Sequence, residues 1–365
     1  MSVRARRRGG ESVMGDLTKQ AEDAIGADDA ASDWKLVPEA HAARLPPQAA
    51  PLRRILEQPT IRVIINEFEV ADKQAVEAQR HYKRVARLRL YTGVAATIIG
   101  ATFVLPIEMW VGKLVDVAAA TQYVCFSASV LAFLHLVRSR PFDLWMKARA
   151  RAEIARISLF DQVMNSDDPS SQPDELPLLP LKLEYFRRYQ LDVQRRYYAG
   201  RGLQHAQAAG QTRRWQIESL CLSGVGVAVA ILALLRIAVE HGGLLPQWVE
   251  HVYATVPTLP GWTNKAVLAT GIIASAFFGA SVSRSLMDLD ERNASRYLTT
   301  AANLNHIYET DLEGARASAA AGATDKVEAF VEGVQRMVSA EHQEWILLSE
   351  TVPGTIRRGT AAQMH

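Results

Sequence analysis

The chain lacks the features that usually mark a secreted, metal-binding or nucleic-acid-binding protein. Only two cysteines, Cys125 and Cys221, occur in 365 residues. Both lie in apolar stretches, so they predict neither a zinc site nor a disulfide framework. The 41 lysines and arginines nearly balance the 39 aspartates and glutamates, whereas nucleic-acid-binding proteins typically carry a basic excess. We therefore expect no metal and no nucleic acid partner.

Catalytic motifs are also absent from the sequence. It contains no phosphate-binding or dinucleotide-binding glycine pattern, and no HExxH, CxxC or GxSxG motif. Glu341 and His342 are neighbours on a predicted helix, but a third metal ligand is missing, which favours a solvated helix face. These absences predict a protein that is not an enzyme and that carries no cofactor.

What the chain does contain is four apolar stretches of membrane-spanning length. They cover residues 90–107, 117–137, 219–235 and 266–283. Each holds about 17–21 residues without Asp, Glu, Lys or Arg, and a spanning helix needs roughly 17–25 residues. The stretches come in two pairs with a long charged segment between them. The sequence therefore predicts an all-α integral membrane protein with four transmembrane helices in two hairpins, plus long cytosolic helical extensions.

The distribution of basic residues predicts how these hairpins are oriented. Lysines and arginines gather before the first stretch, after the second, before the third and after the fourth. The connection inside the first pair holds only Lys113, and residues 237–264 inside the second pair hold no Lys or Arg. By the positive-inside rule, both termini and the central segment lie in the cytosol. We expect a multi-pass protein whose immediate partner is the lipid bilayer.

Composition divides the chain into five segments. Residues 1–50 are rich in Ala, Asp, Glu, Gly and Pro and predict a disordered cytosolic tail. Residues 51–164 and 182–350 are two units of similar design, each with two spans and flanking helices. Residues 165–181 contain four prolines and predict a linker between the two units. Residues 351–365 form a C-terminal tail.

Small residues recur every four positions on the last two predicted spans. On the fourth span they are Gly271, Ser275, Gly279 and Ser283, and on the third they are Gly224 and Ala228. This spacing is typical of helices that pack closely in lipid, and we favour that interpretation. The same stripe also fits the lining of a narrow pore through Ser275 and Ser283, which would require an oligomer.

Several patterns outside the spans resemble one family of prokaryotic membrane proteins. The residues that carry the pattern are Tyr185, Arg188, Gln194 and Tyr197 ahead of the third span, Tyr297, Ala301 and Leu304 after the fourth, and then Glu341, His342 and Trp345. Ahead of the first span they are Phe68, Ala71, Asp72, Ala75 and Gln79. These patterns resemble SLATT domains, the SMODS and SLOG-associating two-transmembrane effector family. The resemblance covers about residues 55–350, as two domains in tandem.

The resemblance implies a function as well as a topology. SLATT proteins look like pore-forming effectors of prokaryotic conflict systems, associated with nucleotide-producing enzymes or nucleotide sensors. By resemblance, this chain lies in the bacterial inner membrane, forms a homo-oligomer and perturbs the membrane in antiviral defence. It carries no recognisable enzyme or sensor domain, so a separate nucleotide-producing or sensor protein would deliver the signal. The alternative is a non-conducting membrane scaffold that anchors a cytosolic defence or signalling partner.

Overall fold

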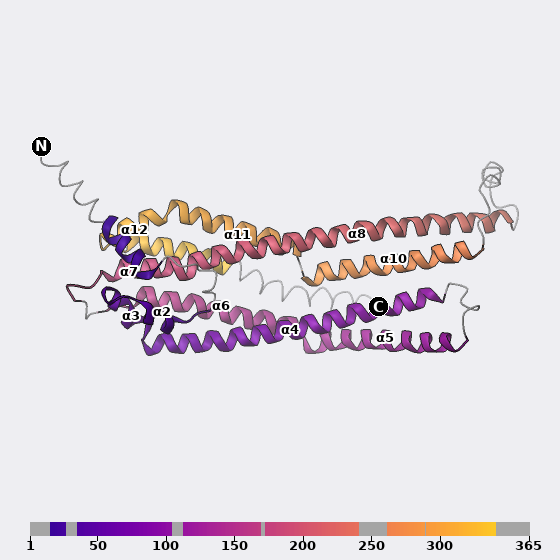
Figure 1. Cartoon of the computed structure of the whole chain (residues 1–365), viewed down its shortest axis with the longest axis horizontal. Coiled ribbons are helices and arrows are strands. Elements are labelled where there is room, and N and C mark those ends of the chain that lie inside the picture. The colour runs from indigo at the N-terminus through magenta and orange to yellow at the C-terminus, as the bar shows by residue number, and fades with distance from the viewer. Residues whose placement is uncertain are drawn as a thin grey trace, which may run out of the picture. The chain divides into compact units, whose positions relative to one another are not determined.

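The part of the chain that the structure describes consists of helices and their connections (Figure 1). This computed structural model describes residues 15–26, 35–103, 112–168, 172–240, 261–288 and 290–340. Side chains are described within these ranges except at residues 112–114, 226, 229–230, 232–240, 261–268 and 286–288. The all-α prediction is confirmed for the described residues.

Proline residues begin several of the helices. Pro59 and Pro141 are the first residues of α4 and α6, a position where the missing N–H leaves no hydrogen bond unmade. In chain order the elements are α2 (Pro38–Arg44), η2 (Pro47–Ala49), α3 (Ala50–Leu56), α4 (Pro59–Thr102), α5 (Gly112–Ser139), α6 (Pro141–Asn165), α7 (Leu178–Phe186), the π-helical turn η4 (Arg187–Asp192), α8 (Val193–Glu240), α10 (Gly261–Asp288), α11 (Asp290–Thr310) and α12 (Leu312–Ala320). Further helices cover residues 15–25 and 325–340.

The helices fall into two compact units. The core unit comprises Met1–Arg80, Pro141–Gln204 and Asn293–His365, and the span unit comprises His81–Arg140 and His205–Arg292. Helical extensions from both halves of the chain therefore share one unit, and the four predicted spans share the other. This grouping differs from the two consecutive units that we predicted on either side of a linker, because packing groups the helices by environment rather than by order; the two consecutive units stay a prediction.

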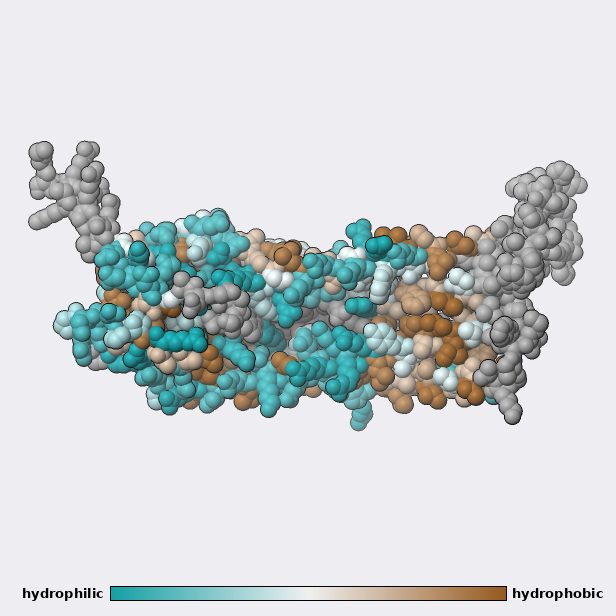
Figure 2. All heavy atoms as spheres, viewed as in Figure 1, coloured by the Kyte–Doolittle hydropathy of each residue, from teal (hydrophilic) through white to brown (hydrophobic). Residues whose placement is uncertain are grey.

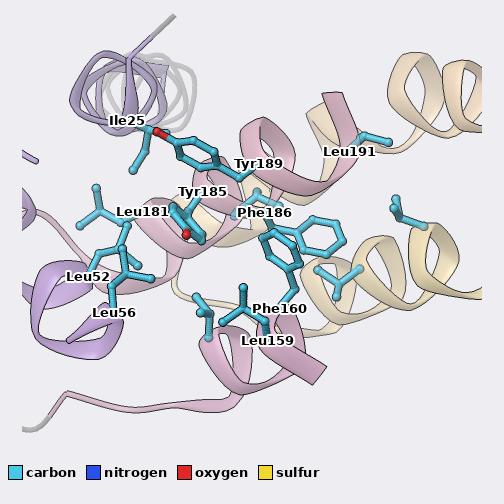
Figure 3. Packing of buried hydrophobic residues seen from close by; sticks show 14 of the residues in the cluster. Ile25, Leu52, Leu56, Leu159, Phe160, Leu181, Tyr185, Phe186, Tyr189 and Leu191 are labelled. Atoms are coloured by element: carbon cyan, nitrogen blue, oxygen red, sulfur yellow. The ribbon is translucent and has the colours of Figure 1, made fainter. Parts of the chain in front are cut away.

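Aromatic residues of α6, α7 and η4 form the centre of the core unit (Figure 3). The ring centroid of Phe186 lies 5.8 Å from that of Phe160 and 6.2 Å from that of Phe330. Tyr185 and Tyr189 continue the cluster, with ring centroids 4.7 Å apart. Burying a large apolar side chain stabilises a fold by roughly 1.5–3 kcal/mol. The cluster therefore holds the middle and C-terminal segments of the core unit together.

The N-terminal region is folded where the structure describes it. The prediction of a disordered tail over residues 1–50 is wrong for residues 15–26 and 35–50, which contribute buried residues to the core unit. In the first helix, Ala21 and Ile25 are buried and lie four positions apart, which places them on one helix face. A composition dominated by Ala and charged residues conceals this short apolar face.

The segment that we predicted as a linker also contacts the core unit. α7 begins at Leu178, inside the predicted linker 165–181. The Arg54 guanidinium of α3 donates to Asp168 at 2.9 and 2.6 Å and to Glu175 at 2.9 and 2.8 Å. A guanidinium presents five N–H donors in one plane, so it can hold two carboxylates at once. The described part of this segment is therefore a docked connection rather than a free linker.

Two described helical segments are long and apolar enough to cross a membrane: Val115–Ser139 in α5, and Ala269–Thr310 across α10 and α11. They contain the second predicted span and most of the fourth. The first predicted span extends beyond residue 103, and much of the third has side chains outside the described set, so four spans stay a prediction. Figure 2 shows apolar residues gathered over the helices of the span unit and hydrophilic residues over those of the core unit.

Candidate functional site

In the span unit, α4 and α5 contact each other through small and polar residues. A Cβ atom at Gly93 would lie 3.2 Å from the Ser129 hydroxyl, and one at Gly100 only 2.6 Å from Gln122 Nε2. The Ser129 hydroxyl donates to the carbonyl oxygen of Arg89 at 3.0 Å. The two glycines thus admit polar side chains of α5 against the backbone of α4, as small residues do between helices in lipid. The small-residue pattern that we noted in the sequence lies on the third and fourth predicted spans and includes neither Gly93 nor Gly100.

Large apolar side chains cover the exposed surface of α5. Those that are more than half exposed are Val117, Tyr123, Val124, Phe126, Leu131 and Leu134. An apolar surface of this extent is unfavourable in water, and the same residue types are favourable in the hydrocarbon core of a bilayer. α5 is therefore suited to face lipid.

A groove of about 590 Å³ lies between α4, α5 and α10. Most of its lining is apolar, but Arg89, Thr97, Gln122, Ser129 and Ser283 bring polar side chains to it. Gly279 also lines the groove, and a Cβ atom there would meet no other atom within 4 Å. We call the space between these residues the polar groove. Its polar side chains are poorly suited to contact with lipid tails, because these cannot hydrogen-bond.

The predicted stripe on α10 divides between two surroundings. Ser275 Oγ lies 3.5 Å from Ser223 Oγ on α8 and donates to the carbonyl oxygen of Gly271 at 2.8 Å. Gly279 and Ser283 line the polar groove instead. One end of the stripe therefore faces a neighbouring helix of the same chain, and the other end faces open space.

The predicted pair on α8 has no close neighbour among the residues that the structure describes. A Cβ atom at Gly224 would meet nothing within 4 Å, and Ala228 is exposed. Close helix approach at Gly224 and Gly279, the interpretation that we favoured, is thus not seen between the described helices of a single chain. Packing between chains and pore lining both stay predictions for these residues.

Imidazole and guanidinium groups lie close to the ends of the predicted spans. His81 Nε2 is 3.0 Å from His135 Nε2, a contact that joins α4 to α5. The guanidinium carbon of Arg89 lies 4.7 Å from the ring centroid of Phe133. Long basic side chains at such positions reach toward lipid headgroups while their stems contact apolar surface. These contacts fix the α4–α5 pair where the first predicted span begins.

The described residues that carry the family resemblance ahead of and after the last two spans lie in the core unit. Tyr185, Arg188, Gln194, Ala301 and Leu304 are buried, and Tyr197 and Tyr297 are partly buried with ring centroids 6.3 Å apart. Glu341, His342 and Trp345 lie outside the described residues. Most of these positions therefore shape the packing of the core unit.

A buried histidine in α2 contacts two of the core tyrosines. His41 Nδ1 lies 3.1 Å from the Tyr185 hydroxyl, and its ring stacks on Tyr189 at 3.8 Å between centroids. Burial, reinforced by the positive charges of Arg44 and Arg188, lowers the pKa of His41 to about 4. His41 is therefore neutral at neutral pH, and its protonation opposes folding.

A buried ion-pair cluster in the core unit has no signal in the sequence pattern. The Glu184 carboxylate, nearly inaccessible to solvent, accepts from Arg316 Nε at 2.7 Å and from Arg187 Nε at 2.5 Å. Burial acts to lower the pKa of Arg187, but the negative charges of Glu184 and Asp192 outweigh it, so this pKa lies above its usual value. Among the described residues, no group of three or more His, Cys, Asp or Glu could hold a metal ion.

Comparison with known proteins identifies the domain that contains the α4–α5 pair. Residues 66–159 match the family model of the SMODS and SLOG-associating 2TM effector domain 3. The matched segment runs from α4 through α5 into α6. No curated protein and no solved structure matches the chain. The SLATT resemblance is confirmed for this segment, whereas a second, tandem domain stays a prediction.

Proposed function

We propose that this protein, a SLATT effector by its matched residues 66–159, is a pore-forming membrane effector of a prokaryotic antiviral conflict system. It is inserted in the bacterial inner membrane as a multi-pass protein with both termini in the cytosol. Several copies assemble through their spans and open a path for ions or small solutes. The polar groove of the span unit is the observation that carries this proposal.

The polar groove favours assembly because lipid alone does not suit it. Gln122 brings an amide, with two donors and one acceptor, and Ser283 brings a hydroxyl. In hydrocarbon, an unsatisfied polar group costs several kcal/mol. Water or the equivalent groove of a second copy supplies hydrogen-bond partners that lipid tails lack. The open space at Gly279 allows a helix of another copy to approach α10 closely.

The apolar lining of the groove suggests how such a path stays closed. The four predicted spans contain no Asp, Glu, Lys or Arg, which argues against a proton pump or an ion-coupled transporter. A narrow apolar constriction that expels water is sufficient to block conduction. α4 and α8 each contribute residues to both units, so a rearrangement of the core unit can shift the closed–open equilibrium.

The activating signal comes from a separate protein in this proposal. The matched family is described as associating with SMODS and SLOG proteins, and a nucleotide-producing enzyme or a sensor would act on the core unit. The chain itself performs no catalytic step. The alternative function is a non-conducting scaffold that anchors such a partner at the membrane.

Crosslinking between copies tests the assembly on which the proposal depends. In a background with Cys125→Ser and Cys221→Ser, a Gly279→Cys variant is oxidised in native membranes and analysed by denaturing electrophoresis. We expect covalent dimers through position 279 on assembly. The matched control is Val124→Cys, at an exposed α5 residue that does not line the groove. Equal crosslinking at both positions, or none at Gly279 under activating conditions, would contradict assembly around the groove.

A further inference from the structure

The core unit has a pocket of its own beside η4. Its volume is about 480 Å³, within the range of roughly 300–1,000 Å³ that is typical of small-ligand sites. η4 and the first turns of α8 provide most of the lining, with further residues from α11 and from the helix at 15–25. Its charged residues are Arg187, Arg188, Arg195, Arg196, Glu22 and Asp192.

The pocket has an excess of positive charge. Four guanidinium groups and two carboxylates line the pocket, which gives its lining a net charge of about +2. Arginine stays protonated at every physiological pH, so this excess does not depend on titration. Such a concave basic surface attracts anions that carry about two negative charges.

Contacts within the pocket fix the orientation of two of its four guanidinium groups, those of Arg187 and Arg195. Arg195 Nε donates to Asn305 Oδ1 at 2.6 Å, and the guanidinium carbon of Arg195 lies 3.8 Å from the ring centroid of Tyr308. Asp192 accepts from Arg195 at 3.2 Å and from Arg187 at 2.7 Å. Side chains that are already held in place lose little conformational entropy when a ligand binds. The pocket is therefore pre-organised for an anion.

The chemistry of the lining suits a phosphate group that carries an organic part. The planar fork of arginine matches phosphate oxygens in bidentate hydrogen bonds. Tyr308 and Ala199 add apolar surface, and the Asn305 amide adds further hydrogen-bonding groups. A bare inorganic anion would leave most of about 480 Å³ empty. The site is thus large enough for a phosphate group together with an organic part.

We propose that this pocket binds an organic phosphate ester, such as the phosphate group of a nucleotide or of a lipid headgroup. The phosphate oxygens accept hydrogen bonds from Arg195 and Arg196, and the organic part contacts Tyr308. The site lies at a π-helical turn, a helix irregularity that is frequently found at functional sites. Binding at this site goes beyond the proposed membrane function and does not depend on conduction by the spans.

Isothermal titration calorimetry on the full chain in detergent micelles tests the proposal. Adenosine 5′-monophosphate is the probe for a nucleotide, glycerol 3-phosphate is the probe for a lipid headgroup, and inorganic phosphate lacks the organic part. We expect one of the two esters to bind with a Kd below about 1 mM and at least tenfold more tightly than inorganic phosphate. The better ester identifies the source.

Charge variants locate the binding. Arg196→Gln, at an exposed side chain of the pocket, is expected to weaken ester binding at least tenfold. Glu22→Gln removes a negative charge from the pocket and is expected to tighten it. Arg201→Gln, at an exposed α8 residue outside the pocket, is the matched control and leaves the affinity unchanged. The proposal fails if neither ester reaches 1 mM affinity, if inorganic phosphate binds as tightly, if Glu22→Gln weakens binding, or if the Arg201 and Arg196 variants behave alike.

Discussion

The close contact between α8 and α11 predicts different stability effects for alanine substitutions at Gly202 and Gly200. A Cβ atom at Gly202 would lie 2.8 Å from Leu298 Cγ, 2.9 Å from Leu298 Cδ2 and 3.2 Å from the Leu298 backbone nitrogen. The Leu298 side chain is partly exposed and can turn aside, but its backbone nitrogen belongs to α11. Gly202→Ala therefore forces a backbone shift. A Cβ atom at Gly200, two residues earlier on the same helix, would meet nothing within 4 Å.

The two substitutions are chemically identical, so their difference isolates the contact. In an α-helix, alanine is favoured over glycine by about 1 kcal/mol, and overpacking costs roughly 1–3 kcal/mol. Because Leu298 can relax in part, we expect Gly202→Ala to be about 1–2 kcal/mol less stable than Gly200→Ala. A unit of this size shifts its Tm by roughly 2–4 °C per kcal/mol. The expected difference in Tm is therefore about 2–8 °C.

Thermal unfolding of the full chain in detergent micelles, followed by circular dichroism, measures this difference. In a Leu298→Ala background, Gly202→Ala is expected to lower the Tm less than it does in the wild type. The difference between the two effects is the coupling between the two positions. Equal Tm values for the Gly200 and Gly202 variants would refute the close approach of α8 and α11.

Two further predictions concern buried charge in the core unit. The pKa of His41 is about 6.5 in the unfolded chain and is lowered to about 4 in the folded protein. Between these two pH values only the unfolded chain binds the proton, so protonation favours unfolding. The free energy of unfolding is therefore expected to fall by about 2 kcal/mol on going from pH 7 to pH 5. Urea unfolding at pH 7 and pH 5 should show this loss of stability in the wild type and a smaller loss in His41→Phe. An equal loss in the two proteins would contradict the lowered pKa of His41. Glu184→Gln leaves two largely buried guanidinium groups short of a partner and is expected to cost about 3 kcal/mol. Glu313→Gln removes an exposed carboxylate that lies 2.9 Å from Arg316, one of these two arginines, and should cost less than about 1 kcal/mol. Similar urea midpoints for the Glu184→Gln and Glu313→Gln variants would refute the burial of Glu184.

Local patterns were sufficient to predict the all-helical class and the second of the four predicted spans. The apolar stretch at 117–137 corresponds to Val115–Ser139 of α5, because hydropathy over about 20 residues is a property of consecutive residues. The long helix expected ahead of the third span is present as α7, η4 and α8. Nothing in its composition announces the π-helical turn, since a π turn reflects tertiary packing more than propensity.

Long-range pairing was not predictable from one sequence. Glu184 and Arg316 are 132 positions apart, and charged residues are ordinarily assigned to the surface. For the same reason the pocket beside η4 could not be predicted, because its arginines come from η4 and α8 whereas Asn305 and Tyr308 come from α11. In both cases the isolated residues look like a solvated helix face, and only the fold shows which of them are enclosed together.

The family motifs show a second limit of prediction from a single sequence. Most residues that carry the resemblance lie in the second half of the chain, whereas the family match covers residues 66–159. In that segment Phe68, Ala71 and Ala75 are buried, and the guanidinium carbon of Arg156 lies 5.3 Å from the Phe68 ring centroid. Small and apolar residues at helical spacing occur in many helices, so their pattern carries little identity until the partners that they contact are known.

The membrane potential of bacteria that express this protein with its neighbouring genes, recorded before and after phage challenge, tests the pore most directly. The account predicts depolarisation after challenge in the wild type and in Val124→Leu, at an exposed α5 residue that does not line the polar groove. Gly279→Leu fills the groove and is expected to abolish the depolarisation. An unchanged potential in wild-type cells that are still protected from phage would contradict pore formation and leave the membrane scaffold.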